Sequence, residues 1–171
     1  MDTQVLDSQG ILRGLLAGAR PRGSIRSMNK TPSTKAVPTK SWTARLQTPT
    51  SPKRVRLDKD FAGIKSGTML FVGTPPIIDA YLRQVPPGET RTIERMRREL
   101  ARTHQCDATC PVSTAIFLRI AAEAAIEGME AGQALAEVSP FWRVIAPDST
   151  IARKLPLDPD WIAHQRALEQ A

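Results

Sequence analysis

The chain has 171 residues and a formal net charge of +7, from 24 basic and 17 acidic residues. The excess charge lies in residues 1–60, which hold 12 basic and 4 acidic residues, and this favours an anionic polymer or surface as partner over a merely solvated tail. Two cysteines and the lack of an apolar stretch of roughly 20 residues argue against a disulfide scaffold and a membrane-spanning protein. We therefore expect a cytoplasmic, nucleoid-associated protein, with Met28 as an alternative start.

The composition predicts two parts: a disordered basic tail over residues 1–60 and one folded domain over residues 61–171. Residues 20–60 are rich in Pro, Ser, Thr, Lys and Arg and lack a sustained apolar period. The exception is a short run in which Trp42 and Leu46 stand four residues apart, the spacing of one helical turn. This run predicts a short helix that docks on the domain or on a partner.

Order is expected to begin near Gly67. Residues 68–72 form a short apolar run between glycines, which predicts a strand. Thr74 and the two prolines after it are typical of a helix start, and the helix is expected to end at Pro86. Its apolar residues fall on one face: Ile77, Ile78, Tyr81, Leu82 and Val85.

A further helix is predicted from Thr92 to about Gln105, with Ile93, Met96 and Leu100 on its apolar face. Four arginines form a basic stripe on the other side: Arg91, Arg95, Arg98 and Arg102. Because no acidic residue interrupts this stripe, contact with phosphates is favoured over a solvated face laced with ion pairs.

The central prediction is a long helix over residues 111–128, followed by a short aromatic strand over residues 140–145. Residues 151–155 are expected to return as a second strand, and Asp158 to cap a last helix that carries Trp161 and Leu168. Two helices joined by a short turn and followed by strands predict a mostly α domain with a small β-wing, a winged helix-turn-helix.

Three segments carry a resemblance to a known family. They are residues 85–92 (VPPGETRT), the Cys110-Pro111 helix start and residues 140–145 (PFWRVI). In order and spacing they resemble the C-terminal DNA-binding domain of the O6-alkylguanine-DNA alkyltransferases, over about residues 68–171. That family has a Val/Ile-Pro-x-Gly turn, an Asn-Pro start to its recognition helix and a Pro-Cys-His-Arg-Val motif. The resemblance implies a winged helix that binds duplex DNA.

The same alignment places Phe141 at the alkyl-accepting cysteine and Trp142 at its histidine partner. Neither side chain is a nucleophile or a base, so no catalytic residue is expected there. The chain is thus similar to the alkyltransferase-like proteins, in which Trp replaces the cysteine, although that subgroup keeps the histidine. Such proteins bind alkylated DNA without repairing it and pass it to other repair proteins. The resemblance implies a lesion pocket of Phe141, Trp142 and Arg143.

Two other family positions differ as well. The family's tyrosine falls on Ile93, and its intercalating arginine falls on Ala122, with Arg119 one turn earlier as a substitute. The full set of predicted DNA-binding residues is Arg91, Arg95, Arg98, Arg102, Ser113, Thr114 and Arg119. Only the first turns of the long helix are expected to approach DNA, because Glu123 and Glu127 make an acidic stripe farther along it.

Two alternative functions remain open. Cys110 lies at a helix N-terminus, where the helix dipole lowers a thiol pKa, so a methyltransferase that uses Cys110 or Cys106 is one of them. A winged-helix module that binds a protein through its acidic stripe is the other. A zinc site at His104, Cys106 and Cys110 is disfavoured by the low cysteine count. We expect a monomer without a metal or cofactor.

Overall fold

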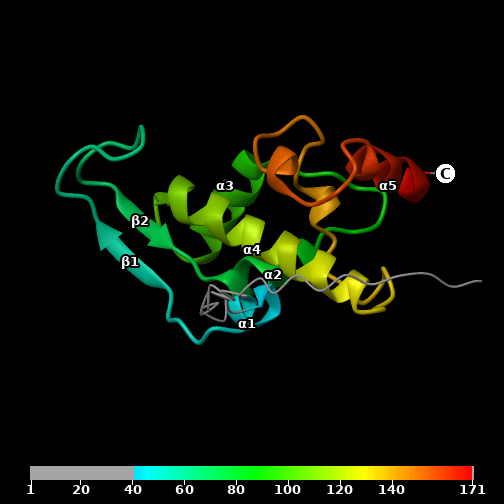
Figure 1. Cartoon of the computed structure of the whole chain (residues 1–171). Coiled ribbons are helices and arrows are strands. Elements are labelled where there is room, and N and C mark those ends of the chain that lie inside the picture. The colour runs from blue at the N-terminus through cyan, green and yellow to red at the C-terminus, as the bar shows by residue number, and fades with distance from the viewer. Residues whose placement is uncertain (1–40, 171) are drawn as a thin grey trace, which may run out of the picture. The chain divides into compact units, whose positions relative to one another are not determined.

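A 20-residue helix, α4 (Pro111–Glu130), is the centre of the fold, and other helices pack along it (Figure 1). The structure is a computed structural model that describes residues 41–170, so the predictions for residues 1–40, including the alternative start at Met28, lie outside the described residues. Helix α4 begins after Cys110 with proline at its first position, as predicted, because a proline there removes no helical hydrogen bond. It extends two residues beyond the predicted end at Gly128.

The other predicted helices are confirmed with small changes in their bounds. They are α2 (Pro75–Arg83), α3 (Ile93–Thr103) and α5 (Trp161–Gln170). Thr92 caps α3, since its Oγ1 accepts a hydrogen bond from the backbone N–H of Arg95 at 3.1 Å. The predicted apolar faces of α2 and α3 are the buried ones, with Leu82 and Met96 both fully enclosed.

One three-stranded sheet lies beside these helices, in the order β1-β2-β3. Strand β2 (Met69–Val72) confirms the predicted strand. It pairs antiparallel with β1 (Lys53–Arg56) and parallel with the two-residue β3 (Ala108–Thr109). Strand β3 ends one residue before the cap of α4, so the sheet leads directly into that helix. The cap residue Cys110 is held to the sheet, because its backbone N–H donates to the carbonyl of Phe71 in β2 at 2.8 Å.

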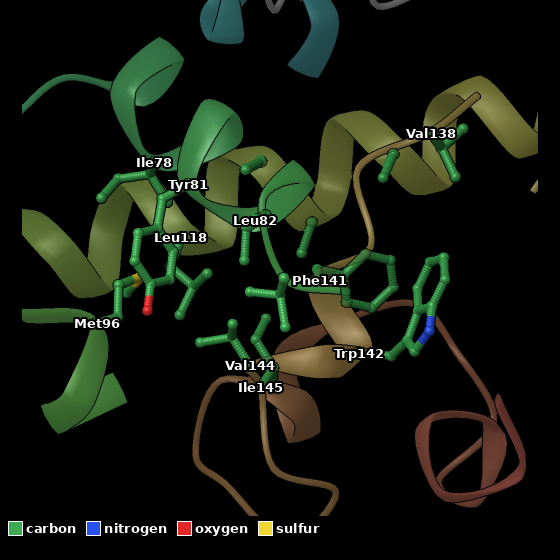
Figure 2. Packing of buried hydrophobic residues seen from close by; sticks show 14 of the residues in the cluster. Ile78, Tyr81, Leu82, Met96, Leu118, Val138, Phe141, Trp142, Val144 and Ile145 are labelled. Carbon is green, nitrogen blue, oxygen red and sulfur yellow. The ribbon is translucent and has the colours of Figure 1, made fainter. Parts of the chain in front are cut away.

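The core lies between α2, α3, α4 and the segment that contains Phe141, as Figure 2 shows. Phe141, Val144 and Ile145 are almost fully buried and pack with side chains from all three helices. Full burial of a phenylalanine or isoleucine contributes about 1.5–3 kcal/mol each. This segment is therefore a large part of the core.

The predicted wing is wrong. Residues 140–145 contain the 3₁₀ turn η1 (Phe141–Arg143), and residues 151–155 contain a second one, η2 (Ala152–Lys154). The carbonyl of Phe141 accepts the backbone N–H groups of both Val144 and Ile145, which closes a turn instead of extending a strand. The segment is aromatic and β-branched because it is buried in the core. In its described part the chain thus has five α-helices and one small sheet, in a mixed α/β arrangement.

Order also begins earlier than predicted, since the range taken for a disordered tail contains β1 and the short helix α1 (Trp42–Leu46). All four side chains of β1 are exposed, and the strand is held by its backbone pairing with β2, which composition does not reveal. Helix α1 confirms the predicted turn and packs on α4. The backbone N–H and Oγ1 of Thr43 both donate to the carboxylate of Glu127, at 2.7 and 2.6 Å.

The docking of α1 should depend on pH through Glu127. The hydrogen bond from the Thr43 hydroxyl is the main cause that lowers the pKa of Glu127 below its ordinary value of 4.5. A lowered folded-state pKa means that the contact stabilises docking above about pH 4.5 and is lost as the pH falls through the folded value. The NMR signal of the Trp42 indole should shift over that range, and Glu127→Gln should abolish the shift. An indole signal that is constant down to about pH 3 would contradict this.

Candidate nucleic-acid interface

The predicted arginine stripe on α3 divides into two groups with different surroundings. Arg91 and Arg95 both bind Glu99, at 3.2 Å and 2.7 Å, and the Tyr81 hydroxyl donates to the same carboxylate at 2.6 Å. This hydrogen bond from Tyr81 and that from Arg95 hold the pKa of Glu99 below its ordinary value, while burial raises the pKa of Tyr81. Arg91 is also largely covered, with 17% of its side chain exposed. The prediction that these two arginines bind phosphate is therefore not supported by their contacts.

Arg98 and Arg102 are exposed and have no acidic partner among the ion pairs of the described residues. Together with Arg97 they line a cavity of about 410 Å³ between α3 and β3. One hydrogen bond joins the two elements that form the cavity, since the side-chain Oγ1 of Thr109 in β3 donates to the backbone carbonyl of Arg97 in α3 at 2.8 Å. These arginines can thus reach an external anion.

Strand β1 adds basic side chains that the sequence analysis did not select. Arg54 and Arg56 lie two residues apart and therefore on the same face of the sheet, the face of Phe71, with which Arg54 is paired in register. The His104 ring stacks on Phe71 with centroids 3.8 Å apart. Because Arg54 is opposite Phe71 and His104 caps the end of α3, Arg54 lies on the side of the sheet where α3 ends. Burial lowers the pKa of His104, and the charge of Arg54 lowers it further.

The four arginines of β1 and α3 form one candidate interface. Adjacent strands are about 4.8 Å apart, so β1 lies about 10 Å from β3 across β2, a gap that arginine side chains can span. In the sequence, β1 is the run KRVR at positions 53–56, whose single apolar residue gives no clear strand signal. We call Arg54, Arg56, Arg98 and Arg102 the basic surface. Lys53 lies on the opposite face of the strand.

The predicted DNA-contacting residues of α4 lie elsewhere and are engaged. Thr114 is 2% exposed and its hydroxyl donates to the Cys110 carbonyl at 2.7 Å, and the Ser113 hydroxyl donates to the same carbonyl at 3.4 Å. Arg119 donates to Glu123 at 2.9 and 3.1 Å and lies over the Trp42 ring, 5.7 Å from its centroid. Helix α4 is thus a core helix covered by α1 and α2, and its role as a recognition helix is not supported.

The predicted lesion-pocket residues form part of the scaffold. Phe141 is 0% and Trp142 is 2% exposed, so both are part of the core, although Trp142 and Arg143 also line a cavity of about 180 Å³. Arg143 and the Trp142 indole donate to the carboxylate of Glu169 in α5, at 2.7 and 2.9 Å, and the backbone N–H of Gly88 donates to it at 3.2 Å. Burial opposes ionisation of Glu169, but these hydrogen bonds together hold its pKa below the ordinary value.

Two of the segments that carry the family resemblance do meet in space. Arg143 Nη1 donates to the carbonyl of Val85 at 2.6 Å, and the backbone N–H of Arg91 donates to the carbonyl of Arg143 at 2.8 Å. The turn at residues 86–88 and the motif at residues 140–145 are therefore held against each other and against α5. Beside this junction is a cavity of about 300 Å³, lined by Ile93 and Val144 among others.

The two cysteines differ in access. Cys110 is 6% exposed, whereas Cys106 is partly exposed and lines the cavity between α3 and β3. The Cys106 thiol lies 3.5 Å from the carbonyl of His104, to which it donates. Within residues 41–170 no three His, Cys, Asp or Glu side chains come together as metal ligands.

Replacing Phe141 with cysteine should not create alkyl transfer. The new thiol would lie in the core without a base, because Trp142 occupies the neighbouring position and its N–H is bonded to Glu169. The substitution should instead lower the free energy of unfolding by about 3 kcal/mol through the cavity that it leaves. Mass spectrometry after incubation with O6-methylguanine DNA checks this. A methyl group on a cysteine of the variant would contradict the prediction, and one on Cys110 or Cys106 of the wild type would favour the methyltransferase alternative.

Comparison of the chain with protein-family models, curated proteins and solved structures finds no match. In the described part of the chain, no helix combines the length and the apolar character that a membrane span requires.

Proposed function

We propose that the chain is a non-catalytic DNA-binding protein of alkyltransferase-like type, which holds the phosphate backbone of a duplex on its basic surface. One observation carries this proposal. The arginines of the basic surface are exposed and form no ion pair with the described residues, although Arg56 Nη1 donates to the carbonyl of Gly67 at 3.2 Å. By contrast, Arg95 on α3 and Arg91, which precedes that helix, are paired with Glu99. Exposed guanidinium groups without acidic partners, on two adjoining elements, suit a polyanion, because each neutralised phosphate releases counterions.

Such backbone contacts give affinity without base specificity, so binding to any duplex should weaken steeply with salt. The slope of log K against log salt is about −0.9 for each phosphate contacted. Replacing Arg54 and Arg56 with glutamine should make the slope shallower by about 1–2. Fluorescence anisotropy with a labelled duplex at several salt concentrations measures it. The matched control is Arg153→Gln with Lys154→Gln in η2, exposed residues that lie outside the basic surface.

A slope that is identical in the wild type and in the Arg54/Arg56 variant would remove β1 from the interface. If the wild type shows no salt-dependent binding to any duplex, the DNA reading fails. The protein-binding alternative would then take its place.

A second candidate is recognition of an alkylated base, and the cavity of about 300 Å³ beside the junction of the two motif segments favours it. The resemblance places the family's tyrosine at Ile93 and the valine of its Pro-Cys-His-Arg-Val motif at Val144, and these two residues line one cavity here. Ser149 and Arg166 supply polar groups to the same cavity, which is of a size that ligand sites have. In this hypothesis the base enters the cavity lined by Ile93 and Val144, and Phe141 is not part of its lining.

Recognition of an alkylated base predicts tighter binding to a duplex that carries one O6-methylguanine than to its unmodified counterpart. Ile93→Trp, which fills the cavity from a partly buried position, should remove that preference and leave general duplex affinity unchanged. Equal affinity of the wild type for the two duplexes would exclude this candidate while leaving the proposed backbone binding intact.

A further inference from the structure

The cavity between α3 and β3 has features that binding to a phosphate backbone does not explain. Its volume is about 410 Å³, far more than the roughly 30 Å³ of a single water and within the range of small-molecule sites. Its floor is apolar, formed by Ala101, Cys106 and Ala108. An elongated ligand with an organic body fits such a space better than a bare phosphate does.

Arg97 supplies the main evidence for an anion in this cavity. Its Nε is enclosed by protein and has no hydrogen-bond acceptor among the described residues, while its backbone carbonyl is taken by Thr109. The enclosed Nε cannot itself be reached from the cavity. The terminal amino groups of Arg97 form no hydrogen bond with the described residues, and they are the donors that an anion in the cavity can use. With Arg98 and Arg102 on the same cavity, three guanidinium groups are available, and their planar forks match the oxygens of a phosphate.

Two carboxylates complete the lining. Asp107 uses Oδ2 to accept the backbone N–H of Met69 at 2.8 Å, which fixes the orientation of the carboxylate and leaves Oδ1 available. Glu94 lines the cavity as well. Carboxylate oxygens accept hydrogen bonds from the amino groups of nucleobases, as they do from cytosine in DNA readout. A purely anionic ligand would be repelled by these two groups, whereas a ligand with an anionic end and an N–H-bearing end would not.

We infer that this cavity binds a nucleoside monophosphate, with the phosphate held by Arg97, Arg98 and Arg102 and the base on the apolar floor beside Asp107. The inference goes beyond duplex binding and does not depend on it. The same chemistry is presented by a free nucleotide and by the terminal nucleotide of a strand that carries a 5′-phosphate.

Cys106 reports on occupancy of the cavity in the full-length protein. Iodoacetamide should alkylate Cys106 and react much more slowly with the buried Cys110, which serves as an internal control in peptide mass spectrometry. Adenosine, guanosine, cytidine or uridine 5′-monophosphate should slow alkylation of Cys106 in a saturable manner. Inorganic phosphate alone should protect much less, because it does not cover the apolar floor.

Arg97→Met keeps the aliphatic stem of the side chain and removes the guanidinium group, so it should weaken protection by about tenfold or more. Arg95→Met is the matched control on the same helix, since Arg95 binds Glu99 and does not line the cavity. The Arg97 variant should also keep its unfolding midpoint, or gain stability, if the buried donor lacks a partner in the free protein. Titration calorimetry with the same nucleotides gives an independent measure of affinity.

A free nucleotide and a strand end are distinguished by repeating the Cys106 protection experiment with a short single strand that carries either a 5′-phosphate or a 5′-hydroxyl. Protection by the phosphorylated strand only, at lower concentrations than by free nucleotides, assigns the site to strand ends. Equal or better protection by free nucleotides assigns it to a small-molecule ligand. If no nucleotide or strand protects Cys106, or if Arg97→Met is protected as well as the wild type, the inference is overturned. Duplex binding by the basic surface can still hold in that case, because Arg54 and Arg56 lie outside the cavity.

Discussion

Arg143→Ala is expected to lower the free energy of unfolding by about 3 kcal/mol or more, a large effect for a residue that the resemblance to the alkyltransferases predicts in a lesion pocket. The side chains of Arg143 and Glu169 are 13% and 18% exposed, and removal of one leaves the other charge largely buried without its partner. Arg143 also joins the Val85 carbonyl to α5. Its loss therefore disconnects three parts of the chain. Urea denaturation followed by circular dichroism measures the change.

Arg153→Ala is the control for this prediction, because Arg153 is exposed and forms no ion pair with the described residues. It should change the free energy of unfolding by less than about 0.5 kcal/mol. If Arg143→Ala is equally mild, the contacts among Arg143, Trp142 and Glu169 do not hold the motif in place. A functional role for Arg143 would then regain support.

The double charge reversal Arg98→Glu with Arg102→Glu is expected to weaken duplex binding by roughly a hundredfold at low salt, for all sequences alike. Both side chains are exposed on α3, so the unfolding midpoint should change little. The matched control is Arg153→Glu with Lys154→Glu, which alters the net charge by the same amount at η2. If both double variants lose affinity equally, net charge and not the basic surface determines binding.

The sequence predicted those elements that local chemistry determines. Strand β2 lies between glycines, and α2 and α4 begin with proline at the position that tolerates it, so their existence followed from the residues themselves. The docked α1 followed from the spacing of Trp42 and Leu46. These signals act within a few residues of the chain.

The errors arose where distant contacts decide the outcome. The aromatic segment at residues 140–145 was read as a strand, but it turns into the core because Arg143 binds Val85 and Glu169, 58 and 26 residues away. Strand β1 was missed because its stability comes from pairing with β2. No local pattern in its four exposed residues indicates burial.

Of the four arginines in the basic surface, the sequence predicted the two on α3 and not the two on β1. Helical spacing identified the arginines of α3, yet it could not show that Glu99 turns toward Arg91 and Arg95 and leaves Arg98 and Arg102 unpaired. Arg54 and Arg56 join them only because the sheet brings β1 to the end of α3. The turn at residues 86–88 and the motif at residues 140–145, two of the segments that carry the resemblance, lie against each other, although the motif residues are structural here.

Hydrogen-exchange mass spectrometry of the full-length protein, with and without a duplex, tests the central claim most directly. A DNA interface on the basic surface predicts slower exchange over residues 53–56 and 97–103 in the complex. It predicts no change over residues 112–119, the first turns of α4, where a recognition helix would contact DNA. Protection of residues 112–119 without protection of β1 and α3 would contradict the account and restore α4 as the DNA-reading helix.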